Sequence, residues 1–143
     1  MSFDLKITNG DFTLSNGDLA TVNGQDKLIQ DILKIAITTA GANPLQPWYG
    51  SLVSRTLIGS HLQTDIVISV AQSQLKNALE NLKNLQTLQT ASGQKTTPDE
   101  LLSFISEVSV TRNASDPRLF SVRIKVLNKA FGKVSTAFNV NNT

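Results

Sequence analysis

The chain has 143 residues, of which 40% are apolar and 17% charged, and its formal net charge at pH 7 is +2. This length suits one domain with a buried core, so we expect a single domain, residues 1–143. With no cysteine and one histidine, disulfides, thiolate metal sites and zinc sites are excluded, and the absence of a signal segment or a run of about 20 apolar residues argues against export and membrane spans.

Asn-Gly occurs three times in the first 24 residues, at intervals of seven, with apolar residues between the pairs. Asn-Gly supplies the positive φ angles of type I′ turns, so residues 1–24 are predicted to form a β-meander that precedes a core of residues 25–143. The spacing would also fit a repeat array, but it stops after three turns, which favours hairpin turns. Strands are expected at about residues 4 to 8, 11 to 15 and 19 to 22.

Two helices are predicted from apolar residues at helical spacing. The first runs from about Gln25 to Thr39 and ends before Gly41 and Pro44. The second runs from near His61 to about Ala91 and would be about 45 Å long. One small core cannot cover that length, so we expect the stretch Leu79–Leu88 to pack on a partner chain, a short cover within the chain being the alternative.

The last third is predicted to be a small antiparallel sheet. Thr97 to Glu100 has the pattern of a capping box with proline at the first helical position, which predicts a brief helix through Phe104. Apolar and polar residues then alternate, so one face of the sheet is apolar and the two main helices must cover it, which gives an α+β fold. Strands are expected at residues 105–112, 119–127 and 134–140.

Charge and aromatic residues mark two candidate surfaces. Between residues 112 and 133 six Lys and Arg face only Asp116, and without interleaved aromatics this basic segment favours solvated strand faces or an acidic protein partner over nucleic acid. The only Trp and the only Tyr, Trp48 and Tyr49, lie in a proline-bracketed connector. They either plug the core or anchor a partner, and the sequence leaves both interpretations open.

The sequence offers no convincing catalytic constellation. His61, the only imidazole, has no predictable base or orienting partner, and the neighbouring carboxylates Asp99 and Glu100 are better explained by the capping box. The glycines are scattered as turn residues rather than gathered in a phosphate loop. We therefore expect no enzyme activity, no catalytic or metal-binding residues and no cofactor.

The order of these parts resembles a known family. A helix leads to Pro44-Leu45-Gln46-Pro47-Trp48-Tyr49-Gly50, then a long helix, then alternating strands. This is similar to the tail-lysozyme-like baseplate wedge family of contractile tails, which contains the sheath initiators of myophages and R-type pyocins. The resemblance covers residues 25 to 127. The chain departs from it near Ser103, where the family's Glu-Pro-Arg step is missing.

The resemblance implies a structural protein of a contractile phage tail baseplate, the sheath initiator that templates the first sheath ring by β-strand addition. The alternatives are another wedge subunit or a basic α+β module that binds nucleic acid. Implied partners are wedge proteins and the sheath protein, with tube and hub proteins as further candidates, and six copies or a multiple per particle. Neither a small-molecule substrate nor a membrane is expected. The location would be the virion, and the host cytoplasm during assembly.

The candidate partner-binding residues fall in four groups, which are the connector, the distal long helix, the basic strand and the last strand, a candidate edge. They are Pro47, Trp48, Tyr49, Leu82, Leu85, Leu88, Arg123, Lys125, Val134, Thr136, Phe138 and Val140.

Overall fold

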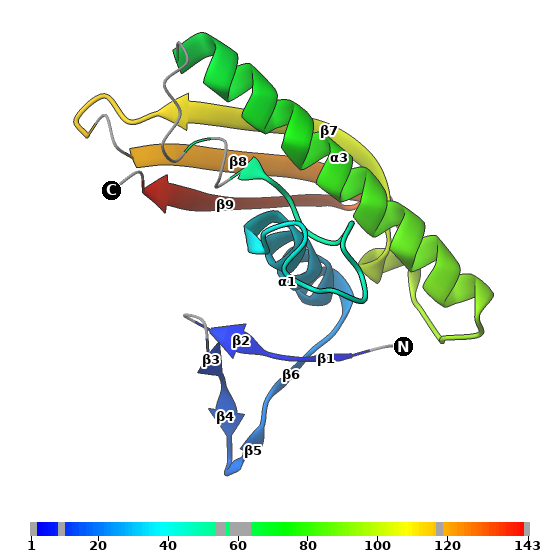
Figure 1. Ribbon diagram of the computed structural model, residues 1–143. Coiled ribbons are helices and arrows are strands. Elements are labelled where there is room, and N and C mark those ends of the chain that lie inside the picture. Colours follow the sequence, from blue (N-terminus) through cyan, green and yellow to red (C-terminus); the bar gives the residue numbers. More distant parts are fainter. Residues whose placement is uncertain (1–2, 9–10, 54–56, 58–63, 117–118, 142–143) are drawn as a thin grey trace.

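The computed structural model describes residues 3–8, 11–53, 57, 64–116 and 119–141. It confirms the α+β class: a three-stranded antiparallel sheet, two main helices on one of its faces, and an N-terminal meander on the other side of α1 (Figure 1). No helix in the described part of the chain is long and apolar enough to span a bilayer.

The sheet has the order β7-β8-β9, and each strand is one to three residues longer at one or both ends than predicted. Its strands are β7 (Leu102–Arg112), β8 (Leu119–Asn128) and β9 (Lys133–Asn141). Because side chains alternate between the faces of a strand, the inward rows gather the apolar residues. The buried members of these rows are Val108, Val110, Phe120, Val122, Ile124, Val126, Val134 and Val140.

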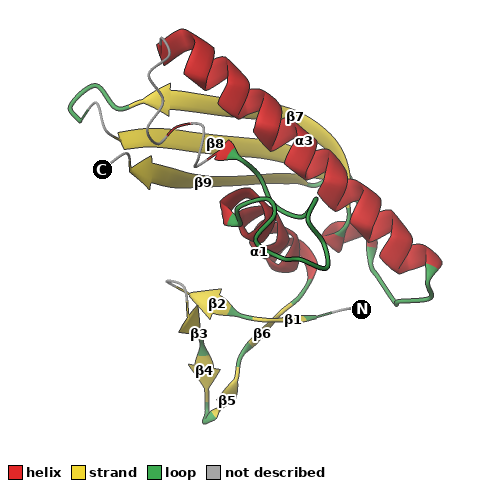
Figure 2. Cartoon of the chain, in the orientation of Figure 1, coloured by secondary structure: helices red, strands yellow, loops and turns green. Residues whose placement is uncertain are grey.

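The two helices cover this inward face (Figure 2). α3 (Thr64–Ala91) crosses the sheet, and α1 (Gly24–Ile37) packs against α3 and beside β9. The predicted start of the long helix near His61 lies outside the described residues. The core between helices and sheet is built largely from aliphatic residues, including Leu28, Ile32 and Leu75, which are fully buried.

The predicted helix through Phe104 is wrong. Only the 3-10 turn η1 (Pro98–Glu100) forms, with the Glu100 carboxylate accepting a hydrogen bond from the Thr97 N–H at 3.1 Å. The chain then enters β7, because the Leu102 N–H donates to the side chain of Gln86 on α3 and the Leu101 carbonyl accepts from the Lys129 N–H. These long-range bonds outweigh the local helix signal.

The meander is a threefold repeat that contains two hairpins. Its six two-residue strands pair as β2-β3, β4-β5 and β1-β6, so the third seven-residue unit pairs back with the first. The units meet in a ring of backbone hydrogen bonds, from the N–H of Lys6 to the carbonyl of Ala20, from Thr13 to Lys6 and from Ala20 to Thr13, at 2.8 to 3.0 Å. The strands are β1 (Asp4–Leu5), β2 (Ile7–Thr8), β3 (Asp11–Phe12), β4 (Leu14–Ser15), β5 (Asp18–Leu19) and β6 (Thr21–Val22).

The hairpins expected from the seven-residue spacing form at β2-β3 and β4-β5, and the pairing of β1 with β6 adds a closure that was not predicted. Asn16 and Gly17 both have positive φ and form the expected turn between β4 and β5. The third Asn-Gly pair makes no hairpin, since Asn23 is the N-cap of α1 and Gly24 begins the helix with φ +59°. The repeat ends after three units because the last strand, β6, pairs with the first, β1.

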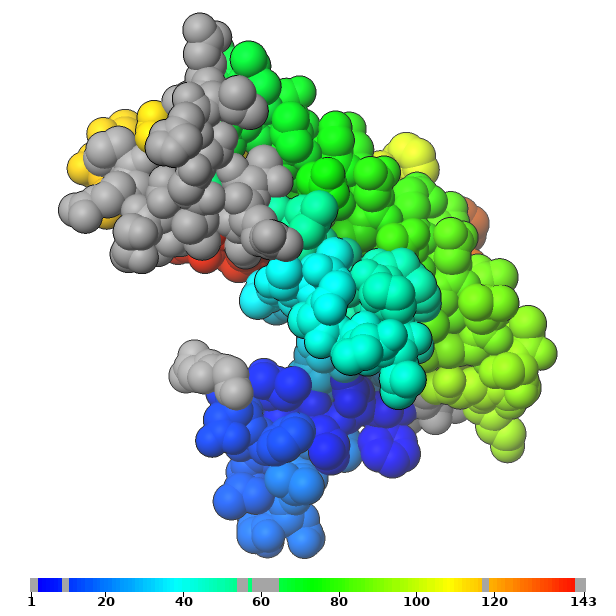
Figure 3. Space-filling view, viewed as in Figure 1, coloured from blue at the N-terminus to red at the C-terminus, as the bar shows by residue number. Residues whose placement is uncertain are grey.

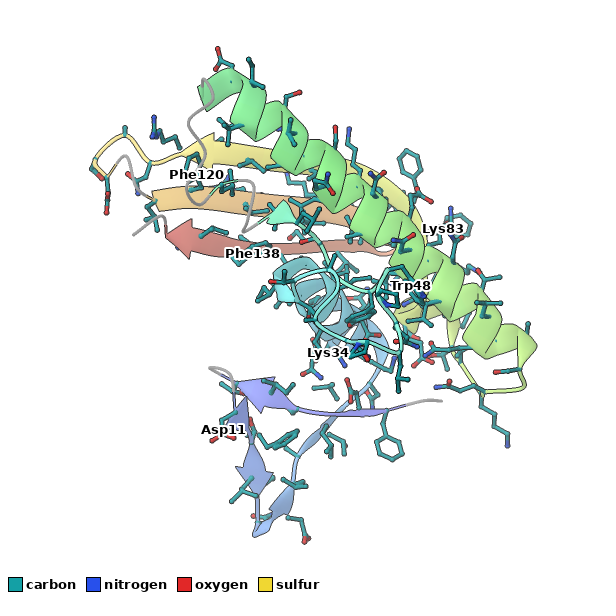
Figure 4. All side chains as sticks on the ribbon, viewed as in Figure 1. Asp11, Lys34, Trp48, Lys83, Phe120 and Phe138 are labelled. Carbon is teal, nitrogen blue, oxygen red and sulfur yellow. The ribbon has the colours of Figure 1, made fainter. Side chains whose placement is uncertain are left out.

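Polar contacts attach the meander to α1. The Gln30 amide donates to the Leu5 carbonyl at 2.8 Å and to Asp4 at 3.0 Å, and its oxygen accepts from the Ile7 N–H at 3.0 Å. Lys34, which faces the meander in Figure 4, forms an ion pair with Asp4. This half-exposed attachment is specific in geometry but buries little apolar surface.

The Asp4–Lys34 pair has a defined pH range. Burial alone would raise the pKa of Asp4, but the hydrogen bond and charge of Lys34 outweigh it and lower that pKa. Burial would lower the pKa of Lys34, and Asp4 and Asp31 raise it instead. The stabilisation is therefore complete at neutral pH. It is lost as pH falls through the lowered pKa of Asp4 or rises through the raised pKa of Lys34.

Candidate functional site

The connector between α1 and the next segment is closed at its base. The Ser51 N–H donates to the Thr38 carbonyl at 2.8 Å, the Ala40 N–H donates to the Ser51 carbonyl at 3.1 Å, and the Ser51 hydroxyl donates to the Ala36 carbonyl at 2.6 Å. Ser51 is thus buried while satisfying carbonyl groups at the end of α1. The connector is therefore a pinned loop with a fixed exit direction.

Gly50 is required by this closure. It has φ +113°, and a Cβ placed there would lie 2.5 Å from the Thr38 carbonyl oxygen. We expect Gly50→Ala to lower the free energy of unfolding by about 3 kcal/mol or more, because backbone strain of about 1–3 kcal/mol is joined by a backbone clash. Gly41→Ala is the matched control, since Gly41 also has positive φ but meets nothing within 4 Å. If urea unfolding shows that Gly50→Ala and Gly41→Ala lose the same free energy of unfolding, the proposed role of Gly50 is wrong.

The loop separates its two aromatic residues. Tyr49 packs against the core, whereas Trp48 is 43% exposed and makes an edge contact with Tyr49 at a centroid distance of 6.2 Å. Leu45 and Pro47 are exposed beside Trp48 in the sequence, and Figure 4 places Trp48 on the loop near α3. Tyr49 therefore belongs to the core, whereas Trp48 is exposed and its role as a partner anchor stays a prediction.

The distal part of α3 is covered mainly within the chain. Leu79 is fully buried and Leu82 is 3% exposed, so the expected need for a partner is wrong for these two residues. Leu85 is half-buried, and partner contact there stays a prediction. α1 and the connector supply the cover that the sequence did not reveal. Only Leu88 is left outside, with 66% of its surface exposed.

The sheet ends in two edges, because β7 and β9 each pair only with β8 among the described strands. β7 has two register irregularities, between Leu102 and Phe104 and between Ile105 and Glu107, whereas β9 keeps nine successive pairs with β8. Bulges protect an edge from further pairing, so β9 is the less protected one. The side chains of Val134, Thr136, Phe138 and Val140 lie in its inward row, which leaves the backbone as its binding element.

The basic residues on β8 point to the outer face of the sheet. Arg123 and Lys125 are exposed, and Lys125 forms an ion pair with Glu107 of β7 at 3.4 Å. Glu107 lies outside the basic segment in sequence, and strand pairing brings it there. Arg123 pairs in register with Ser109 and Ala137, which are uncharged.

Four polar residues that organise these surfaces were not singled out from the sequence. Gln30 holds the meander, Ser51 closes the connector, Gln86 joins α3 to β7, and Asn128 caps the β8–β9 turn by accepting hydrogen bonds from the N–H groups of Ala130 and Gly132. Gln86 does break the apolar stripe of the long helix at a position that faces inward. That break is the one signal that sequence inspection had available.

A concavity of about 240 Å³ lies where the meander, α1, the connector and distal α3 meet. Its two carboxylates, Asp4 and Asp31, both lie within ion-pair distance of Lys34. The pKa of Asp4 is lowered, as set out above, so Asp4 is ionised at neutral pH. In the described part of the chain, no three His, Cys, Asp or Glu residues are grouped so that they could hold a metal ion.

Comparison with known proteins identifies the fold only. No protein-family model and no curated protein matches the sequence. Among solved structures, a "putative tail lysozyme" from Geobacter sulfurreducens aligns with a TM-score of 0.62 over 93% of this chain and 97% of that one, at 10% sequence identity. The two proteins therefore share a fold along nearly their whole lengths.

Proposed function

We propose that this protein is a structural component of a contractile phage tail baseplate. In that role it would be the sheath initiator, presenting β9 to an extended arm of a sheath subunit. The arm would pair with β9 as a fourth strand. Wedge proteins would hold the initiator in place.

The regular edge of β9 carries the proposal, because no described strand pairs with it and α1 lies beside it without joining the sheet. Its nine paired residues include no proline, and the register with β8 is uninterrupted, so the free side can continue the sheet by backbone hydrogen bonding. An unprotected edge of this length invites pairing with another chain, and proteins usually shield such edges unless they use them. Within β9, Lys133 is the one charged residue, of the kind that discourages unwanted strand pairing at an edge.

The shared fold supports a tail location. The Geobacter sulfurreducens protein is named a putative tail lysozyme, and the fold likeness spans nearly the whole of both chains. Its name also includes a lysozyme activity, which we do not extend to this chain. A lysozyme uses two carboxyl groups that flank the substrate, whereas in the concavity the Asp4 carboxylate is bound to Lys34 and Gln30. Peptidoglycan turnover by the purified protein that is lost on replacing Asp99 or Glu100 would show that the chain is an enzyme and overturn the purely structural role.

Paired proline substitutions test the proposed use of the edge. Successive residues of a strand direct their N–H groups to opposite sides, so Thr136→Pro and Ala137→Pro remove donors from opposite sides of β9. One variant loses a bond to β8 and melts at a lower temperature, while the other loses only an edge donor. We expect the variant that melts normally to stop sheath polymerisation from reconstituted baseplates.

A proline on β7 provides the control for this experiment. Ser109→Pro and Val110→Pro form the same kind of pair on the irregular edge, and the stably folded one is expected to support sheath growth. Sheath growing at the wild-type rate from the stably folded β9 variant would exclude strand addition at β9. If the stably folded β7 variant also fails to support sheath growth, the defect is one of general assembly, and a role specific to β9 is equally contradicted.

A further inference from the structure

The meander exposes more apolar surface than a unit of its size can hide. Phe12 and Leu14 are 55% and 68% exposed, and Ile7 and Leu19 are 40% and 49% exposed. The residues pair across the two hairpins, Ile7 with Phe12 and Leu14 with Leu19, so they form two contiguous apolar steps. A unit of about 20 residues cannot build its own core, and contiguous exposed apolar residues mark interaction sites.

Each of these two hairpins also carries an exposed aspartate. Asp11 pairs with Thr8 beside the first apolar step, and Asp18 pairs with Ser15 beside the second. The third strand pair differs, because there Asp4 and Leu5 are engaged by Gln30 and Lys34 of α1. The repeat is thus attached to α1 through β1 and through the Ile7 N–H of β2, and it leaves the side chains of Asp11, Phe12, Leu14 and Asp18 exposed. Figure 3 shows the meander as a blue lobe that projects from the body.

The outer face of the sheet has the complementary character. Its residues are mostly small, and Ser109, Ser121, Ser135 and Ala137 are among them. Arg123 lies between Ser109 and Ala137 and has no charged residue paired with it in register. Phe104, 60% exposed, pairs with Leu127 at one end of this face. Both main helices pack on the opposite face, so no described helix covers this one.

One chain cannot bring these two surfaces together. The meander lies beyond α1, on the side away from the sheet, and its β4-β5 end points away from the body (Figure 1). Complementary surfaces that cannot meet within a molecule can meet between copies of it. The negative charges of Asp11 and Asp18 are complementary to the positive charges of Arg123 and Lys133. The exposed apolar pairs of the two hairpins can pack against the exposed side chain of Phe104.

We propose that the outward hairpins of one copy, β2-β3 and β4-β5, dock on the outer sheet face of a second copy. The contact is head-to-tail, since it joins different surfaces of the two molecules, and it therefore closes into a ring or continues as a filament. It involves the sheet face and leaves the β9 edge free. The proposal thus goes beyond sheath initiation, and either can fail without the other.

Charge exchange tests this contact in the purified protein. Sedimentation velocity of the wild type should show self-association that rises with concentration and weakens with added salt. The double variants Asp11→Lys/Asp18→Lys and Arg123→Glu/Lys133→Glu should each associate at least about tenfold more weakly. Mixed in equal amounts, they should associate again, because the reversed hairpins of one variant then match the reversed sheet of the other.

A third variant controls for net charge. Lys76→Glu/Lys95→Glu makes the same change as the sheet variant at exposed positions on and just beyond α3, and it should associate like the wild type. Circular dichroism melting checks that every variant is folded. A wild type that stays monomeric at millimolar concentration, or charge variants that do not regain association on mixing, would overturn the proposal. The same holds if nucleic acid, rather than protein, is needed for association.

Discussion

Replacing Gln86 by leucine should cause a large loss of stability. The Gln86 side chain is 4% exposed and joins α3 to the start of β7, accepting from the Leu102 N–H at 2.8 Å and donating to the Glu100 carbonyl at 3.2 Å. Leucine would fill the space but leave both backbone groups buried without this partner. Each such group costs about 1–3 kcal/mol, so we expect the two together to lower the free energy of unfolding by about 2–6 kcal/mol.

Gln74→Leu is the matched comparison, because Gln74 is half-buried on the same helix. It should change the free energy of unfolding by about 0.5 kcal/mol or less, as is usual for surface positions. Urea unfolding of both variants gives the two free energies directly. If Gln86→Leu unfolds at the wild-type urea concentration, the bridge between α3 and β7 does not hold this corner of the fold together.

Replacing Trp48 by alanine should have the largest effect on assembly. Trp48 is 43% exposed on a loop pinned at its base by Ser51, so its removal costs the isolated protein little. Tryptophan at a protein interface often contributes 2 kcal/mol or more, which is about a 30-fold change in affinity. We therefore expect normal melting and at least a 30-fold weaker incorporation into reconstituted wedges.

Tyr49→Ala should have the opposite profile. Tyr49 is half-buried, packs on the core cluster and has its pKa raised by burial, so its truncation should lower stability by about 2 kcal/mol. Melting temperature and wedge incorporation, measured for both variants, separate the two roles. Lower melting of Trp48→Ala with wild-type incorporation would show that Trp48 belongs to the core and does not contact a partner.

The sheet and helices were predictable because each has a regular apolar period. The alternation along Leu119–Asn128 and the helical stripe along Thr64–Ala91 depend on which side chains face the core, and this is written into local sequence. The helix expected after Pro98 was wrong because its backbone groups bond to Gln86 and Lys129, which lie far along the chain. A local capping signal cannot report such partners.

The candidate surfaces were less predictable for the same reason. Trp48 and Tyr49 are adjacent in sequence, and only the closure of the loop by Ser51 sends one inward and leaves the other outside. Leu82 and Leu88 carry the same apolar signal, yet cover from α1 and the connector reaches only Leu82. The seven-residue repeat was visible, but its closure depends on Lys6, Thr13 and Ala20, which share no side-chain chemistry.

Imaging the assembled particle tests the central claim most directly. A density map of a baseplate with its first sheath ring, at a resolution that traces strands, should reveal a strand from a sheath subunit hydrogen-bonded to β9, with six copies of this protein or a multiple of six around the tail axis. A β9 edge that faces solvent in that map, while sheath subunits contact another surface or none, would contradict the account.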